Sequence, residues 1–154
     1  CLSFQSIPMV FPYFTSANIA PKKTGDQGRL SAIKAVSSLP NSHNGAMVFN
    51  CTYNTGPYIL YLRPNMQFID LLDPRLYRNT SPTQYLLRNK LVHGKIKDPY
   101  HVLKASFSAQ YVVCMCAGLI KQMERDHRFQ RLYPDPKNPR NTFAKVWTYM
   151  LLDE

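Results

Sequence analysis

The residues in this chain that could do chemistry include four cysteines, and their spacing gives little pattern. They are Cys1, Cys51, Cys114 and Cys116. The chain has no C-x-x-C pair and no Cys/His cluster, which argues against a zinc site. Cys114 and Cys116 fall two residues apart on an expected helix, so they should point to different faces. Because small secreted domains use denser cysteine patterns, we expect these thiols to be mostly reduced or incidental.

The other titratable residues form no catalytic pattern either. The chain has no Gly-rich phosphate loop, and its acidic residues are scattered. Glu124 and Asp126 should point around an expected helix rather than toward each other. The histidines lack partners at ligand spacing; they are His43, His93, His101 and His127. We therefore expect no enzyme, no catalytic, cofactor-binding or metal-binding residue, and no cofactor.

Composition indicates a basic chain that folds against partners. The 154 residues are one domain by length, with twelve prolines, ten tyrosines and eight phenylalanines. Prolines spread through an aromatic-rich chain favour extended segments buried against another surface, and a loop-rich autonomous domain is the alternative. Nineteen Lys and Arg against nine Asp and Glu give a net charge of +10. Such a chain attracts phosphate, in nucleic acid or in anionic lipid.

The longest uncharged run, residues 105–120, lies within one expected helix over 98–133. Asp98-Pro99 is a typical helix start, and Pro134 would end the helix. The run is either a membrane span over 102–120 or a helix buried in a protein core, and we favour the span. Small and polar residues would line one side of this helix and pack against a partner. These helix-packing residues are Ser106, Gln110, Cys114, Ala117 and Gly118.

The preceding segments predict an arm, a hairpin and short helices. Residues 1–28 read as an extended apolar arm, and residues 29–72 as a short helix followed by a β-hairpin. The hairpin rests on alternation from Ala46 onward, turn residues at 54–57, and a second apolar run at 58–62. Residues 73–97 carry Asp-Pro and Ser-Pro starts and predict short capped helices.

Residues 134–154 predict a Pro-rich linker and a terminal amphipathic helix. The apolar residues of that helix fall at i, i+3, i+4, i+7 and i+8. They are Phe143, Val146, Trp147, Met150 and Leu151, of which Phe143, Trp147 and Met150 are the expected docking anchors. The expected fold is thus mostly α, with a small β-hairpin, extended Pro-rich segments and one long central helix that we expect to be transmembrane. It is not a compact autonomous globule.

The order of motifs in the C-terminal half resembles a known family. Asp73-Pro74 is followed by Asn79-Thr80-Ser81-Pro82 at a helix start. Residues 94–99 (GKIKDP) then lead through the apolar run into residues 121–126 (KQMERD). This order resembles the small single-pass accessory subunits of mitochondrial respiratory complex I, of the β-subcomplex type. The resemblance covers about half of the chain.

The resemblance implies a non-catalytic structural accessory subunit of a mitochondrial inner-membrane respiratory complex, complex I in the first place. Its partners would be other subunits and membrane lipid, with no small-molecule substrate. The alternative is a mitochondrial ribosomal protein that binds rRNA and neighbouring proteins through a basic, extended surface. A third hypothesis is a secreted glycoprotein, since Asn50-Cys51-Thr52 and Asn79-Thr80-Ser81 are N-x-S/T sequons.

Overall fold

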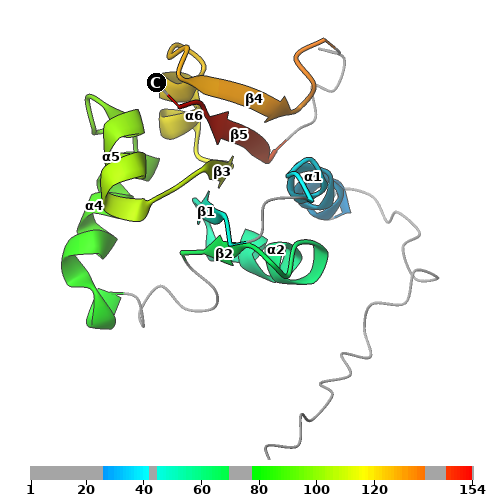
Figure 1. Cartoon of the computed structure of the whole chain (residues 1–154), viewed down its shortest axis with the longest axis horizontal. Coiled ribbons are helices and arrows are strands. Elements are labelled where there is room, and N and C mark those ends of the chain that lie inside the picture. Colours follow the sequence, from blue (N-terminus) through cyan, green and yellow to red (C-terminus); the bar gives the residue numbers. More distant parts are fainter. Residues whose placement is uncertain (1–25, 42–44, 70–77, 138–144, 154) are drawn as a thin grey trace, which may run out of the picture.

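The computed structural model of the chain describes residues 26–41, 45–69, 78–137 and 145–153. Helices and strands alternate along this part of the chain (Figure 1). In order they are α1 (Asp26–Ser37), β1 (Met47–Asn50), η2 (Tyr53–Thr55), α2 (Gly56–Leu62), β2 (Gln67–Phe68), α4 (Pro82–Val92), α5 (Pro99–Phe107), β3 (Tyr111–Cys114), α6 (Ala117–Met123), β4 (Phe129–Tyr133) and β5 (Trp147–Leu151).

The strands form one mixed sheet in the order β2-β1-β3-β5-β4. β1 runs parallel to both β2 and β3, whereas β5 runs antiparallel to both β3 and β4. In Figure 1, α1 and α2 lie on one side of the sheet, and α4 and α5 lie on the other. The result is a three-layer α/β/α arrangement with β1 and β3 at its centre.

The central strands are apolar on both faces because helices cover both faces. Phe49, Val112 and Cys114 face the core beneath α4, α5 and α6. Val48 and Val113 face the second core, beneath α1 and α2. The alternation that predicts a strand from Ala46 onward is confirmed by β1, although its partners differ from the expected hairpin.

The predicted fold class is wrong at the long helix. Residues 98–133 form two short helices and two strands in place of one helix. α5 ends where Ser108 adopts a left-handed conformation with φ of 50°, and the chain then enters β3, the fully buried strand YVVC. A strand covered on both faces reads as a continuous apolar run, which a membrane span also does. Among the described residues, no helix is long and apolar enough to cross a bilayer.

Two further elements differ from the expectation. The run at 58–62 belongs to helix α2, with Pro57 in its first turn, so the predicted hairpin is wrong. The terminal residues Trp147–Leu151 form strand β5 in place of a helix. Of the expected arm at 1–28 only residues 26–28, the start of α1, are described, and the expected terminal linker lies partly outside the described residues.

Two glycines allow α4 and α6 to approach backbone to backbone. Gly94 follows α4 with φ of +67°, and a Cβ there would lie 2.9 Å from the carbonyl oxygen of Gly118. A Cβ on Gly118 would lie 2.7 Å from the carbonyl carbon of His93. Only glycine fits such a contact, because backbone atoms on the other side cannot rotate away.

Gly118→Ala is therefore expected to lower the free energy of unfolding by about 1–3 kcal/mol, the usual cost of an overpacked contact. Gly28→Ala is the matched control, since nothing lies within 4 Å of a Cβ at Gly28 in α1. That control should be neutral or stabilising by about 0.5–1 kcal/mol, as Gly-to-Ala changes in helices are. Urea denaturation of both variants would measure the difference; equal midpoints would contradict the close contact.

Candidate functional site

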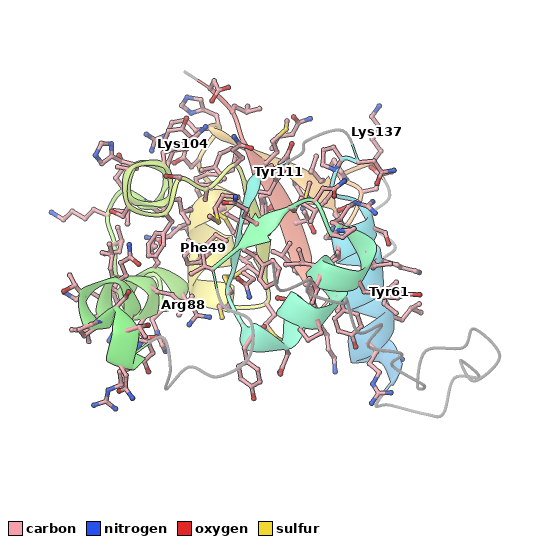
Figure 2. The ribbon with its side chains drawn as sticks, turned by 60° about the horizontal axis from the view of Figure 1, so that its bottom comes forward. Phe49, Tyr61, Arg88, Lys104, Tyr111 and Lys137 are labelled. Atoms are coloured by element: carbon pink, nitrogen blue, oxygen red, sulfur yellow. A yellow bond between two sulfur atoms is a disulfide. The ribbon has the colours of Figure 1, made fainter. Side chains whose placement is uncertain are left out.

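The described surface carries its exposed large apolar side chains unevenly. Those exposed by about a third or more are Leu30, Tyr53, Leu60, Tyr61, Leu86, Met115 and Leu152. The first four lie on α1, η2 and α2, which contact one another in space. Figure 2 shows Tyr61 on α2, beside α1 and away from α4, where Arg88 lies. Large apolar groups gathered on neighbouring elements indicate an interaction surface more than scattered ones do.

Local sequence explains why these side chains point outward. In α1 the side chains of Ala32, Ala35 and Val36 are buried against the sheet, which leaves Leu30 and Lys34 on the solvent side. In α2 the Ile59 side chain is fully buried, and Tyr58 and Leu62 pack against the same core. Leu60 and Tyr61 remain outside, with exposures of 52% and 70%. We call the exposed side chains of Arg29, Leu30, Lys34, Tyr53, Leu60 and Tyr61 the α1–α2 face.

One arginine fixes the two helices of this face relative to each other. Arg63 follows α2 and donates from Nε to the carbonyl of Leu39 at 2.9 Å and from Nη2 to that of Ser37 at 2.6 Å. Its Nη1 donates to the carbonyl of Leu62 at 2.7 Å. These carbonyls belong to the ends of α1 and α2, where intrahelical partners are missing. The α1–α2 face is therefore held in place before any partner binds.

The electrostatics of the α1–α2 face are one-sided. Residues 27–41 and 45–69 contain no Asp and no Glu. Arg29 and Lys34 are exposed on the same helix as Leu30. The carboxylate of this part is Asp26, the first residue of α1, and it stands against the cations Arg29, Lys34 and Arg63. The described residues 26–41 and 45–69 are therefore net positive, and their charge complement is acidic.

A polar cluster surrounds Arg128, the residue immediately before β4. Its Nη2 donates to Asp98 Oδ1 at 2.9 Å and to Asp126 Oδ2 at 2.8 Å, and its guanidinium lies 4.5 Å from the centre of the Tyr100 ring. The backbone N–H of His101, with help from Arg128, lowers the pKa of Asp98. The Arg128 hydrogen bonds lower the pKa of Asp126, and those carboxylates in turn raise the pKa of Arg128.

Arg128→Met is expected to lower the free energy of unfolding at pH 7 by about 1–2 kcal/mol, a value reduced because these groups remain partly in water. Carboxyls with lowered pKa values stabilise the fold above their unfolded pKa, about 3.9, and lose this contribution as pH falls through the folded value. The deficit should therefore shrink as pH falls below the unfolded value and through the lowered folded values of Asp98 and Asp126. Arg125→Met, an equal charge change at an exposed residue, is the control. A deficit that is constant with pH would contradict the pairing.

A second polar cluster links β4, β5 and the end of α6. Tyr149 donates its hydroxyl to Glu124 Oε1 at 2.6 Å, and Arg131 donates to Glu124 Oε2 at 3.2 Å. Burial, and then the Glu124 carboxylate, raise the pKa of Tyr149. Arg131 also lies 5.3 Å from the centre of the Trp147 ring. Because Glu124 accepts hydrogen bonds from both Tyr149 and Arg131, this cluster holds the end of α6 against β4 and β5.

Two open hollows border these clusters. The first, about 550 Å³, is lined by Lys97, Pro99, Gln122, Arg125, Asp126, His127 and Arg128. The second, about 500 Å³, includes Glu124, Arg131 and Tyr149 in its lining. Neither lining contains a cysteine or serine nucleophile beside a base. Charged side chains line both hollows, which suits them to electrostatic contact with a ligand or partner.

The predicted helix-packing residues do not share one face, because the long helix is absent. Ser106 is exposed on α5 and Gln110 is exposed just before β3. Cys114 is buried at the end of β3. Ala117 is exposed in α6, whereas Gly118 contacts residues 93 and 94 at the end of α4. Gly118 is thus the one residue of this set whose small size the structure explains.

The predicted docking anchors are also separated. Phe143 lies outside the described residues. Trp147 and Met150 lie on opposite faces of β5, half-buried against different cores. Trp147 stacks on Tyr149 with ring centres 6.4 Å apart. Their docking role stays a prediction, while the α1–α2 face, which sequence reasoning missed, offers larger exposed apolar groups.

The cysteines differ most from the expectation. Cys51 and Cys114 form a disulfide across the adjacent ends of β1 and β3, so these two thiols are neither reduced nor incidental. Cys116 is a free, half-buried thiol whose pKa is raised by burial and lowered in part by Arg88. Together the three are the one group of His, Cys, Asp and Glu side chains, among the described residues, that could hold a metal ion.

The two sequons have different surroundings. Asn50 is fully buried; its amide nitrogen donates to the carbonyl of Thr52, and its side-chain oxygen accepts from the N–H of Ile69 at 3.2 Å. A glycan on Asn50 is incompatible with this packing. Asn79 is exposed, so only the second sequon stays open to modification in the folded chain.

Comparison of the chain with protein-family models, with curated proteins and with solved structures found no match.

Proposed function

We propose that this chain is a non-catalytic accessory domain that docks on an acidic protein surface through the α1–α2 face. The observation that carries the proposal is the combination on this face of exposed Leu30, Tyr53, Leu60 and Tyr61 with the cations Arg29 and Lys34, in a region that has no Asp or Glu over residues 27–41 and 45–69. Tyrosine supplies large, rigid contact area and is enriched in protein interfaces. The face is fixed in advance by Arg63, which lowers the ordering cost of binding.

Charge complementarity defines the partner. The net charge of +10 attracts an acidic partner at long range. The exposed Arg29 and Lys34 disfavour a basic partner on the α1–α2 face itself. The partner surface should therefore present Asp or Glu around an apolar pocket that receives Leu60 and Tyr61. Such a contact gains affinity from the buried apolar groups and specificity from the charges.

A protein partner fits this face better than lipid or RNA does. Sequence-readable binding to anionic lipid uses clusters of about four to eight cations, and RNA-binding surfaces likewise cluster Lys and Arg. The α1–α2 face has two exposed cations, Arg29 and Lys34. Its four large apolar groups exceed its charges, which is the balance of a protein interface.

This proposal keeps the accessory role that the sequence suggests and omits the spanning helix. Complex I of the mitochondrial inner membrane stays a prediction of the sequence resemblance, as does rRNA binding under the ribosomal alternative. The α1–α2 face supplies a defined surface, and variants of its residues would test binding to either kind of assembly.

Selection of short random peptides against the purified chain tests the proposal without a known partner. We expect enrichment of peptides that combine Asp or Glu with Leu, Phe or Trp. Their binding should weaken as salt rises, and should be lost in the Arg29→Glu/Lys34→Glu double variant because like charges then face each other.

Two further probes separate the alternatives. Phosphatidylserine vesicles and single-stranded RNA should bind the wild-type chain and the double variant alike, since neither should use this face. If the selected peptides bind the double variant unchanged, or if vesicles or RNA compete with them for the wild-type chain, the α1–α2 face is not a protein-docking surface.

A further inference from the structure

Three sulfur atoms from distant parts of the chain meet at one end of the central strands. Cys51 follows β1, Cys114 ends β3, and Cys116 immediately precedes α6. Because β1 and β3 are parallel neighbours with Asn50 opposite Val113, their ends bring Cys51 beside Cys114. The three Sγ atoms all lie within 4.8 Å of one another. This meeting depends on the fold and is independent of the α1–α2 face.

A hydrogen bond from the backbone links Cys116 to Cys114. The N–H of Cys116 points at Cys114 Sγ at 3.4 Å. An N–H directed at sulfur favours the negatively charged thiolate, as outer-shell donors do around metal-bound ligands. The short loop between β3 and α6 thus presents Cys114 and Cys116 to the same point.

A buried cation lies beside the three sulfurs. Arg88 on α4 is 6% exposed and donates from Nη2 to the carbonyls of Asn50 and Cys51, at 3.3 and 2.8 Å. These bonds hold the guanidinium at the end of β1, next to the cysteines. A positive charge in this position favours the thiolate form of the neighbouring Cys116.

We propose that, when the Cys51–Cys114 disulfide is reduced, the thiolates of Cys51, Cys114 and Cys116 bind one zinc ion. A dithiol reductant transfers two electrons to the disulfide, gives two thiols and leaves as its own cyclic disulfide. The three thiols then release three protons as they ligate Zn²⁺. The resulting site has a net charge of −1, which the guanidinium of Arg88 balances.

The geometry requires small movements. Tetrahedral zinc with Zn–S bonds of about 2.3 Å places its sulfurs about 3.8 Å apart. Reduction releases the 2.05 Å Cys51–Cys114 bond, which lets those two sulfurs separate to that distance, and Cys116 Sγ needs to approach by about 1 Å. Since Cys116 is half-buried, the fourth position of the ion opens toward solvent.

The disulfide and the zinc site exclude each other, because Cys51 and Cys114 ligate zinc as thiolates and neither is a thiolate while the disulfide is intact. The cluster therefore has two chemical states, and the redox environment selects between them. Either state ties β1 to β3, so either one stabilises the centre of the sheet.

Titration of the chain with Co²⁺, a spectroscopic substitute for Zn²⁺, tests the site. The chain is first reduced with a phosphine, which avoids added thiols, and then titrated with Co²⁺ and back-titrated with Zn²⁺. We expect one thiolate-to-cobalt absorption band that saturates at one ion per chain and disappears as Zn²⁺ displaces Co²⁺. The oxidised chain should show no such band.

Cys116→Ser separates this site from the disulfide alone. The variant keeps Cys51 and Cys114, so its oxidised form should remain folded by circular dichroism. Its reduced form should bind Zn²⁺ more weakly. Because Cys116 would be a direct ligand, the loss should exceed the roughly 10–100-fold cost of removing an outer-shell contact. Cys1→Ser is the control and should bind as wild type does. Equal affinity in wild type and Cys116→Ser, or the absence of the cobalt band in the reduced chain, folded or not, would overturn the proposal.

Discussion

Reducing the Cys51–Cys114 disulfide in the presence of a chelator is expected to lower the free energy of unfolding by about 4 kcal/mol, the chain-entropy value for a loop of this length. The two cysteines are separated by 63 residues. When the bond is intact, that segment is a closed loop in the unfolded chain, and the unfolded state has fewer conformations. Native domains are stable by only about 5–15 kcal/mol, so the expected loss is a large fraction of the total stability.

The Cys51→Ala variant isolates the effect of the bond. Its urea midpoint should fall near that of the reduced wild-type chain and should not respond to reductant. Cys116→Ser keeps the bond and should respond to reductant as the wild type does. A wild-type midpoint that stays constant on reduction would show that the bond does not form in the native chain. The chelator is needed because zinc bound to the freed thiolates would hide part of the loss.

Removing Tyr61 from the α1–α2 face is expected to weaken binding of the selected acidic peptides by about 30-fold, which corresponds to about 2 kcal/mol. Tyr61 is 70% exposed, so its truncation leaves the core intact and acts on the partner contact. Tyrosines at the centre of an interface commonly reach this size of effect. Isothermal titration of Tyr61→Ala against a selected peptide measures it.

A leucine pair provides the matched control. Leu60 on α2 and Leu86 on α4 are both exposed, by 52% and 60%. Leu60→Ser should weaken peptide binding in the same direction as Tyr61→Ala, whereas Leu86→Ser should leave it unchanged. Equal losses in the two leucine variants would show a nonspecific hydrophobic effect, and no loss in either would remove Leu60 from the interface.

Patterns among residues close together in the sequence correctly predict some elements of the fold. The alternation at Val48, Phe49 and Asn50 predicts a strand that the structure confirms as β1. The spacing of Leu30, Ile33 and Val36 predicts a helix near 29–39, and α1 spans Asp26–Ser37. Ser81-Pro82 predicts the start of α4, although Ser81 makes no side-chain cap hydrogen bond.

Sequence patterns give wrong predictions where packing in the folded chain decides which side chains are buried. The run Tyr111–Cys114 is uncharged because helices bury both faces of β3, and sequence alone does not separate such a strand from part of a longer apolar helix. In β5, Trp147 and Met150 pack against different cores, so a spacing that fits a helical stripe comes from a two-sided strand. Pro57 reads as a turn but stands in the first turn of α2.

The candidate sites depended on contacts that the sequence does not contain. Pairing of Cys51 with Cys114 follows from the register of β1 against β3, and cysteine connectivity cannot be deduced from spacing. The α1–α2 face had one usable signal, the absence of Asp and Glu from residues 27–41 and 45–69. Which apolar residues in this region would be exposed required the helix orientations.

Site-specific photo-crosslinking in the native source tests the docking proposal most directly. A photoreactive amino acid is placed at position 60 in one variant and at position 86 in another. The α1–α2 face predicts a discrete protein adduct at position 60, none at position 86, and loss of the adduct when Arg29→Glu and Lys34→Glu are added. Equal adducts at both positions, an adduct that survives the charge reversal, or adducts to lipid or RNA alone would contradict the account.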